Sequence, residues 1–284
     1  MKNKENILPE DFYKKNLFYD CGDKSMKARL GFLPCSIWKP DIKITKFLKD
    51  IINDKCQVRE TKNANRSDRR HGVNNGKCSV FNPQLAQMIL AAYAPLSGKI
   101  YDPFGGGGTR GYIATKMGFN YTGVEIREEE YNRVKDQMRD WGMSFNFILG
   151  DSLSYIPDEN FDFIFTCPPY YDLEVYSDLK DDLSNANSYG EYLEMLQKVL
   201  KNCYQVLKKD CFAVFVVGNF RNKKGELEHL NGDLILQAKK AGFKLWDELI
   251  WEGASNVALT RCGKFEKNRK SVRMHEYIII LKKG

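Results

Sequence analysis

Four consecutive glycines, Gly105 to Gly108, constrain the fold of this chain more than any other feature of its 284 residues. They follow an apolar run that ends at Asp102, and they precede residues 111–117, whose composition is typical of a helix. Such a turn can adopt backbone angles that a Cβ would block, and it lets a ligand approach the main chain. The N-terminus of the following helix would point at the same place. The sequence therefore predicts a buried strand, a nucleotide-binding turn and a helix in succession.

Strand and helix patterns alternate along the rest of the chain. Strands are expected at 96–101, 120–126, 145–149, 161–165, 211–217, 243–251 and 277–281, and helices at 84–94, 111–117, 128–141, 189–208 and 234–240. Apolar strands that alternate with helices are typical of a parallel sheet covered on both faces. We therefore predict an α/β fold, with a doubly wound, mostly parallel, Rossmann-like sheet of seven strands.

The N-terminal part of the chain lacks this regular pattern. We predict an N-terminal extension with a basic loop over residues 1–78 and the main domain over residues 79–284. Within the extension, residues 31–38 look extended. Apolar residues at helical spacing predict one amphipathic helix over 42–52, which we expect to pack onto the main domain.

Composition narrows the class of protein further. The eight cysteines form no C-x-x-C pair and do not cluster with the three histidines, which argues against a zinc site and against a secreted disulfide framework; we expect no metal. No apolar run reaches the length of a signal peptide or a membrane span, so we expect a cytoplasmic protein without membrane association. The net charge of +7 weakly favours polyanionic partners.

Three acidic residues follow three successive predicted strands. In a parallel sheet the carboxyl ends of the strands share one edge, and ligands bind there near the switch point. Asp102 is predicted to face the ammonium group of an amino-acid moiety, although it could instead cap the next helix. Glu125 is placed to accept hydrogen bonds from ribose hydroxyls, with a solvated glutamate as the alternative. Asp151 would accept from an adenine amino group or cap a turn.

The segment Thr166-Cys-Pro-Pro-Tyr170 is the second strong signal. Two prolines after a buried strand fix the backbone and remove two donors, so we expect their carbonyls to be rigid, free acceptors. The Tyr170 ring offers a flat surface for stacking. Acceptors beside a π-face suit an exocyclic amine on a heterocycle: the carbonyl would hold the amine and orient its lone pair.

These motifs carry a family resemblance. Asp102 to Thr109 resembles the DPFxGxGT motif of S-adenosylmethionine-dependent DNA amino-methyltransferases, and Cys167 to Tyr170 resembles their Asp/Asn/Ser-Pro-Pro-aromatic motif. Residues 79–83 look like the segment that precedes the glycine motif and closes over the methionine end of the cofactor. The resemblance covers about 79–284. More narrowly, residues 168–177 and 212–218 resemble DNA methylases of phages and mobile elements.

The resemblance implies the methyltransferase form of the predicted sheet, S-adenosyl-L-methionine as cofactor, and methyl transfer to adenine N6 or cytosine N4 of DNA. It implies the following cofactor contacts: Phe81, Asp102, Phe104, Gly105, Gly107, Thr109, Glu125, Ile126, Asp151 and Ser152. It implies catalytic roles for Cys167, Pro168, Pro169 and Tyr170. The ring of Tyr170 would stack on a base that has left the duplex.

Cys167 departs from the family motif, because thiol sulfur is a weak acceptor. Either the Pro168 carbonyl is the main acceptor that holds the substrate amine, or the substrate is unusual. Cys167 could also be a nucleophile, as in cytosine-C5 methyltransferases. Enzymes that methylate RNA or a protein glutamine hold the acceptor amine in the same way, so these substrates are alternatives. A non-catalytic module that binds nucleic acid is a further alternative.

Two basic segments flank the predicted site and would bind nucleic-acid phosphates. The candidate contacts are Arg66, Arg69, Arg70, Arg261, Lys264, Lys267 and Arg269. The alternative is a pair of solvated surface loops. The expected partner is DNA, with RNA as a second possibility.

Overall fold

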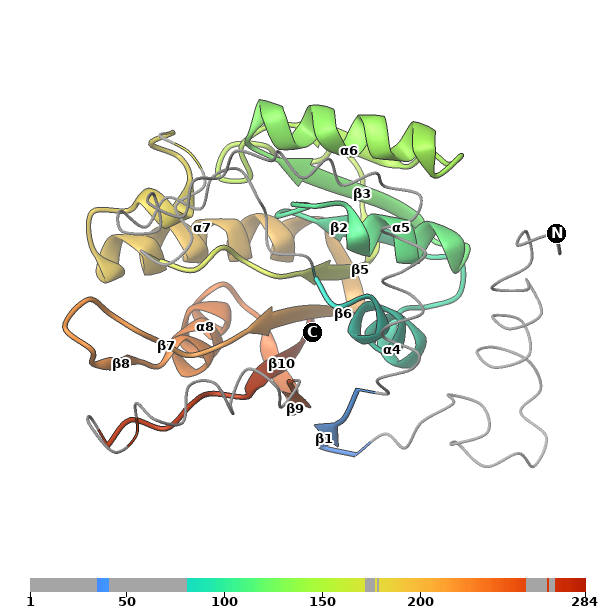
Figure 1. Cartoon of the computed structure of the whole chain (residues 1–284). Coiled ribbons are helices and arrows are strands. Elements are labelled where there is room, and N and C mark those ends of the chain that lie inside the picture. The colour runs from blue at the N-terminus through green and yellow to red at the C-terminus, as the bar shows by residue number, and fades with distance from the viewer. Residues whose placement is uncertain (1–34, 41–80, 172–176, 178, 254–264, 266–268) are drawn as a thin grey trace, which may run out of the picture.

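The computed structural model describes residues 35–40, 81–171, 177, 179–253, 265 and 269–284 (Figure 1). Its centre is an eight-stranded sheet. In their order across the sheet, the strands are β1 (Ile37–Trp38), β9 (Lys244–Glu252), β10 (His275–Lys282), β6 (Leu207–Val217), β5 (Phe161–Thr166), β2 (Lys99–Asp102), β3 (Asn120–Glu125) and β4 (Asn146–Leu149). The helices are α4 (Pro83–Tyr93), α5 (Thr109–Lys116), α6 (Glu128–Asp140), α7 (Tyr189–Val206) and α8 (Leu230–Lys240), with a short 3-10 helix, η2 (Leu183–Asn185).

All neighbouring strands of this sheet are parallel except at β10, which runs antiparallel to both β6 and β9. The chain moves outward from β2 through β3 to β4, then returns to β5 on the other side of β2. This reversal makes the carboxyl ends of β2 and β5 the switch point, where ligands of such sheets bind. Because β10 is reversed, its first residues lie at that same edge.

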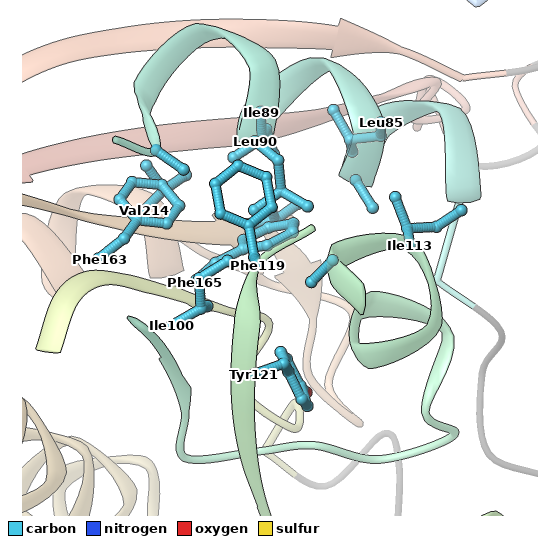
Figure 2. Packing of buried hydrophobic residues seen from close by; sticks show 14 of the residues in the cluster. Leu85, Ile89, Leu90, Ile100, Ile113, Phe119, Tyr121, Phe163, Phe165 and Val214 are labelled. Atoms are coloured by element: carbon cyan, nitrogen blue, oxygen red, sulfur yellow. The ribbon is translucent and has the colours of Figure 1, made fainter. Parts of the chain in front are cut away.

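Helices cover both faces of the sheet. Residues of α4, α5 and α6 share one hydrophobic cluster, and residues of α7 and α8 share the other. Figure 2 shows the first cluster, in which Leu85, Ile89 and Leu90 of α4 lie over the strand residues Phe163 and Phe165. The predicted doubly wound, mostly parallel α/β fold is confirmed.

Each predicted strand and helix of the main domain is present, with ends shifted by a few residues. Two features were not predicted from sequence. The eighth strand, β1, pairs with β9, and Trp38 within it is 2% exposed and joins the first core cluster. A hairpin of β7 (Phe220–Arg221) and β8 (Leu227–Glu228) follows β6. Both features consist of two-residue strands, which are too short to produce a periodic pattern.

The predicted N-terminal extension therefore contributes a strand to the main sheet. Residues 36–38 are extended there, within the predicted extended segment 31–38. The helix predicted over 42–52 and the boundary predicted at residue 78 lie outside the described residues. Among the described helices, none has the length and apolar character needed to cross a membrane.

The start of α4 is fixed by local chemistry. The Asn82 side-chain oxygen accepts hydrogen bonds from the backbone N–H groups of Gln84 (2.9 Å) and Leu85 (3.2 Å), and Pro83 occupies the first helical position. Asparagine caps and first-turn prolines both favour helix initiation. This cap holds the preceding residue, Phe81, at the edge of the sheet where the candidate site lies.

Candidate active site

A cavity of about 730 Å³ opens at the carboxyl edge of the sheet. Its first part, which we name the cofactor end, is lined by Phe81, Phe104, Gly105, Gly107, Thr109, Glu125, Ile126, Asp151 and Ser152. Its second part, the acceptor end, is lined by Cys167, Pro168, Pro169, Tyr170, Gly218, Asn219, Phe220, Trp251, Gly253, Arg273, Met274, His275 and Glu276. The structure thus brings the two sequence motifs together on one cavity.

The glycine turn has the geometry that its sequence predicts, and the reasons differ between its residues. Gly106 and Gly108 have positive φ values of 51° and 74°, which glycine adopts without strain. A Cβ on Gly105 would stand 2.5 Å from Cε2 of Phe147 on β4. The backbone of Gly105 is held against the next strand by a 2.7 Å hydrogen bond from its N–H to the Val124 carbonyl. The turn is therefore a close-packed wall of the cofactor end.

Asp102 ends β2, as predicted, but its side chain is used within the protein. Its side chain is 0% exposed, and it does not line the cavity. Oδ2 accepts hydrogen bonds from Arg110 Nε and the Tyr121 hydroxyl, both at 2.6 Å. Oδ1 accepts from the Thr166 hydroxyl at 2.6 Å and from the Phe104 N–H at 3.1 Å. With both oxygens used, the position of Asp102 does not support the predicted contact with an ammonium group.

Asp102 instead joins the two motifs. Thr166 is the last residue of β5 and directly precedes Cys167, so the Asp102–Thr166 bond ties the glycine turn to the Pro-Pro-Tyr turn. Burial, the largest single cause, would lower the pKa of Arg110, but the Asp102 carboxylate acts together with Tyr121 and Cys167 to raise that pKa above its ordinary value. Arg110 also donates to the Phe104 carbonyl and lies 5.0 Å from the Phe81 ring centroid. One buried ion pair thus positions several walls of the cavity.

Glu125 and Asp151 line the cofactor end as predicted. Glu125 is 8% exposed, and its Oε1 accepts from the Arg127 N–H at 2.9 Å. Burial raises the pKa of Glu125, while the hydrogen bond and the charge of Arg127 oppose that rise. Asp151 caps its own turn, because Oδ1 accepts from the Leu153 N–H at 2.8 Å and Oδ2 from the Ser154 hydroxyl at 2.9 Å. The contacts predicted for them, with ribose and with adenine, stay predictions.

Ser152 contributes mainly to the architecture of the cofactor end. Its hydroxyl donates to the carbonyl of Pro103, and its own carbonyl accepts from Asn202 Nδ2 of α7 at 3.0 Å. These bonds fasten the loop after β4 to the glycine turn and to the helix behind it. The side chain is buried, so a direct contact with a ligand remains a prediction.

The Pro-Pro-Tyr turn presents one carbonyl rather than two. The Tyr192 hydroxyl of α7 donates to the Pro169 carbonyl at 3.0 Å, so this carbonyl is not free as the sequence led us to expect. Among the described residues, none donates a hydrogen bond to the Pro168 carbonyl. The Tyr170 hydroxyl accepts from the Gly218 N–H at 2.8 Å, which anchors the ring at the acceptor end. The half-buried Cys167 lines the cavity beside them.

Sequence reasoning missed much of the acceptor end. Gly218, Asn219 and Phe220 follow β6 directly, so the rule that strand ends carry ligands would have found them. The Phe220 ring packs edge-on against Tyr170, with centroids 6.3 Å apart. Of residues 273–276, Arg273 belonged to the basic stretch 261–273 noted in the sequence, and the other three gave no comparable signal. They enter the site because β10 is antiparallel, and strand direction is not visible in the sequence.

The predicted nucleic-acid contacts lie mostly outside the described residues. This applies to Arg66, Arg69, Arg70, Arg261, Lys264 and Lys267. Arg269 is exposed, and its guanidinium lies 6.0 Å from the Phe265 ring centroid. Arg269 does not line the cavity, so its predicted phosphate contact stays a prediction.

Comparison with known protein families shows to which family the chain belongs. A family model for N6 and N4 methyltransferases, described as DNA methylase, matches residues 4–136 and 161–284. The chain belongs to this DNA methylase family. The match begins at residue 4, so the likeness extends through the predicted N-terminal extension and is not confined to 79–284.

Two curated relatives match parts of the chain. The type II methyltransferase M.MjaVI of Methanocaldococcus jannaschii is 30% identical over 110 residues, which cover 39% of this chain and 54% of the relative. The type II beta methyltransferase M.BslI of a Bacillus species is 26% identical over 183 residues, which cover 58% of this chain and 19% of the relative. The chain therefore spans about half of the first relative and a fifth of the second.

Solved structures of other proteins share the fold of this chain. A methyltransferase from Pyrococcus furiosus has a TM-score of 0.50 at 14% identity, with 77% of this chain and 92% of that chain covered. The cyclase SpnF has a TM-score of 0.51 at 15% identity, with coverages of 74% and 85%. Since a cyclase and a methyltransferase share the architecture, this likeness shows the fold alone.

Proposed function

We propose that the protein transfers a methyl group from S-adenosyl-L-methionine to an exocyclic amine of DNA, at adenine N6 or cytosine N4. One observation carries the proposal: the glycine turn and the Pro-Pro-Tyr turn line a single cavity. The first motif suits a nucleotide-like cofactor and the second suits an amine acceptor. Membership of the DNA methylase family supports the same reaction and substrate.

The residues at the cofactor end fit S-adenosylmethionine. The backbone of Gly105 to Gly107 forms a wall without side chains, Glu125 offers a carboxylate to the ribose, and Phe81 and Ile126 offer apolar surfaces. When bound, the cofactor supplies an electrophilic methyl group on sulfur. Asp102 has no contact with it in this proposal, because its carboxylate is used within the protein.

At the acceptor end, the protein would hold the target base and its amine. The base leaves the duplex stack to reach the cavity, and the Tyr170 ring stacks on it. The Pro168 carbonyl accepts one N–H of the amine, which directs the nitrogen lone pair toward the cofactor end. The amine loses a proton after it has gained the methyl group. Positioning two bound molecules in this way contributes on the order of 7–11 kcal/mol to lowering the barrier.

Methyl transfer from labelled cofactor to DNA, RNA and protein, measured side by side, tests this proposal. The expected result is label in DNA alone, with N6-methyladenine or N4-methylcytosine found by mass spectrometry of the nucleosides. Label in RNA or in protein glutamine would contradict the proposal that DNA is the substrate. C5-methylcytosine, together with a covalent Cys167 adduct, would replace the amine chemistry by nucleophilic catalysis. Binding of DNA without any methyl transfer would indicate that the protein is a non-catalytic module that binds nucleic acid.

A further inference from the structure

We propose that Arg273, supported by Arg221 and Lys270, forms a phosphate-binding site at the mouth of the acceptor end and holds a backbone phosphate beside the target nucleotide. This inference rests on the proposed function, since it names the part of the DNA that these residues hold. Lys270 and Arg273 belong to the second basic segment noted in the sequence, residues 261–273, whereas Arg221 lies outside both basic segments.

Arg273 is the centre of this site. It precedes β10 and lines the cavity, and its Nη1 is buried without a hydrogen-bond partner among the described residues. A buried guanidinium N–H without a partner costs on the order of 1–3 kcal/mol, more when the group is charged. An anionic acceptor arriving from the cavity would remove that cost. The arginine is thus prepared for a ligand rather than for an internal contact.

A second arginine lies close by. The charge on Arg221, at the end of β7, reaches Arg273, and together with burial, which is the larger cause, it lowers the pKa of Arg273. Neighbouring guanidinium groups repel each other unless an anion lies between them. Two forked donors of this kind match the oxygens of a phosphate.

Lys270 joins this pair through the β7–β8 hairpin. Arg221 Nη1 and Lys270 Nζ both donate to the Gly225 carbonyl, at 3.1 Å and 2.8 Å. The hairpin and the segment before β10 are therefore fastened together at one point. In Figure 1 the hairpin extends beyond the carboxyl end of β6, and its residue Phe220 lines the cavity.

Two acids of the β7–β8 hairpin are held by a neighbour on the hairpin itself. Asn222 Nδ2 donates to Glu226 Oε2 at 3.0 Å and to Glu228 Oε1 at 2.7 Å, which holds both carboxylates on their own hairpin. No carboxylate of the described residues forms an ion pair with Arg221, Lys270 or Arg273. Glu226 and Glu228 are thus held on the hairpin, while Glu276 also lines this end of the cavity.

The position of the cluster favours a DNA phosphate over the carboxylate of the cofactor. β10 is separated from β2 by β6 and β5, so the start of β10 lies three strand spacings, about 14 Å, from the glycine turn. Tyr170 and Arg273 both line the acceptor end. A base stacked on Tyr170 would bring its own backbone to this side of the cavity.

The test compares Arg273→Gln with the matched control Arg139→Gln, an exposed arginine of α6. Affinity for a mixed-sequence DNA duplex is measured by fluorescence anisotropy over a series of salt concentrations. We expect Arg273→Gln to bind DNA about tenfold more weakly, with a slope of log K against log salt that is smaller by about 0.9. The control should change neither quantity, and Arg221→Gln should act like Arg273→Gln but more weakly.

Calorimetry with S-adenosylmethionine and a melting curve complete the design. Unchanged cofactor affinity in a folded Arg273→Gln variant is expected, and Arg273→Lys should restore part of the DNA affinity. An unchanged DNA affinity and salt slope would overturn the inference, as would a loss of cofactor affinity with DNA binding intact. DNA binding is measured without catalysis, so a parent protein that binds DNA but transfers no methyl group would contradict the proposed function alone.

Discussion

The two ends of the cavity are built in different ways. The cofactor end draws most of its lining from the single stretch between residues 102 and 152, in which three strands each deliver one loop to the same edge. The acceptor end draws on the segments 167–170, 218–220, 251–253 and 273–276, which come from four distant parts of the chain. A cofactor site of this type is a local property of the chain, whereas the acceptor site exists only after the whole sheet has formed.

Asp102 is the residue on which both ends depend, so its replacement should have the largest effect. Asp102→Asn leaves the buried Arg110 without its counter-charge and weakens the bond to Thr166. Breaking a buried ion pair costs about 3–5 kcal/mol, which should appear as a lower free energy of unfolding in urea, with loss of both cofactor binding and methylation.

Asp136→Asn is the matched control for this prediction. Asp136 pairs with Arg139 on the exposed face of α6, where an ion pair contributes about 1 kcal/mol or less. If Asp102→Asn were as stable as this control and kept cofactor affinity, Asp102 would not be the link between the two ends.

Replacement of Tyr170 should affect the acceptor end and leave the cofactor end unchanged. Tyr170→Ala removes the stacking surface, worth about 1–3 kcal/mol per base, together with the orientation of the base. We expect methylation to be abolished while calorimetry shows cofactor affinity retained. Tyr170→Phe keeps the ring but loses the hydroxyl that accepts from the Gly218 N–H, and it should keep most activity. Equal loss of methylation and cofactor affinity in Tyr170→Ala would contradict a role confined to the acceptor end.

A change at Gly105 should act at the cofactor end. In Gly105→Ala the new Cβ would meet the Phe147 ring at 2.5 Å, so the turn or the ring must shift. Such overpacking costs about 1–3 kcal/mol, and we expect cofactor affinity to fall by about tenfold. Phe147→Leu in the same chain should restore part of it.

Gly190→Ala on α7 serves as the control for that change. A Cβ there would have its nearest neighbour, Ser188 Oγ, at 3.7 Å, so the substitution fits. Cofactor affinity should be unchanged. An equal response of the two alanine variants would show that close packing at Gly105 does not shape the cofactor end.

Cys167→Ser should have the smallest effect. A hydroxyl is a better acceptor than a thiol, and the side chain only assists the Pro168 carbonyl in the proposed mechanism. We expect the rate of methylation under saturating cofactor to change by no more than a few-fold, with the exposed Cys35→Ser as control. Complete inactivity of Cys167→Ser, with parent activity in Cys35→Ser, would make Cys167 a nucleophile.

The sequence was sufficient to predict the class of fold and the cofactor end. Asp102 to Gly108 specifies a sharp turn through local backbone chemistry, and the alternation of strands and helices places successive turns at one edge. Pro168-Pro-Tyr170 was likewise readable, because prolines restrict the backbone wherever they stand. These are short-range effects, and they do not require knowledge of which strands are neighbours.

Only the tertiary structure decided how the charges and carbonyls of the site are used. Asp102 looked like a ligand contact until packing surrounded it with Arg110, Tyr121 and Thr166. The Pro169 carbonyl looked free until α7 brought the Tyr192 hydroxyl to it. Both outcomes depend on residues distant in sequence.

The direction of strand β10 decided which further residues reach the acceptor end. β10 runs against its neighbours, which carries Arg273 to the edge where the parallel strands end. A pattern of apolar residues is the same in either direction along a strand, so sequence periodicity cannot reveal this reversal. The sequence by itself determined what the glycine and proline turns can do, and the pairing of distant strands determined which side chains meet them.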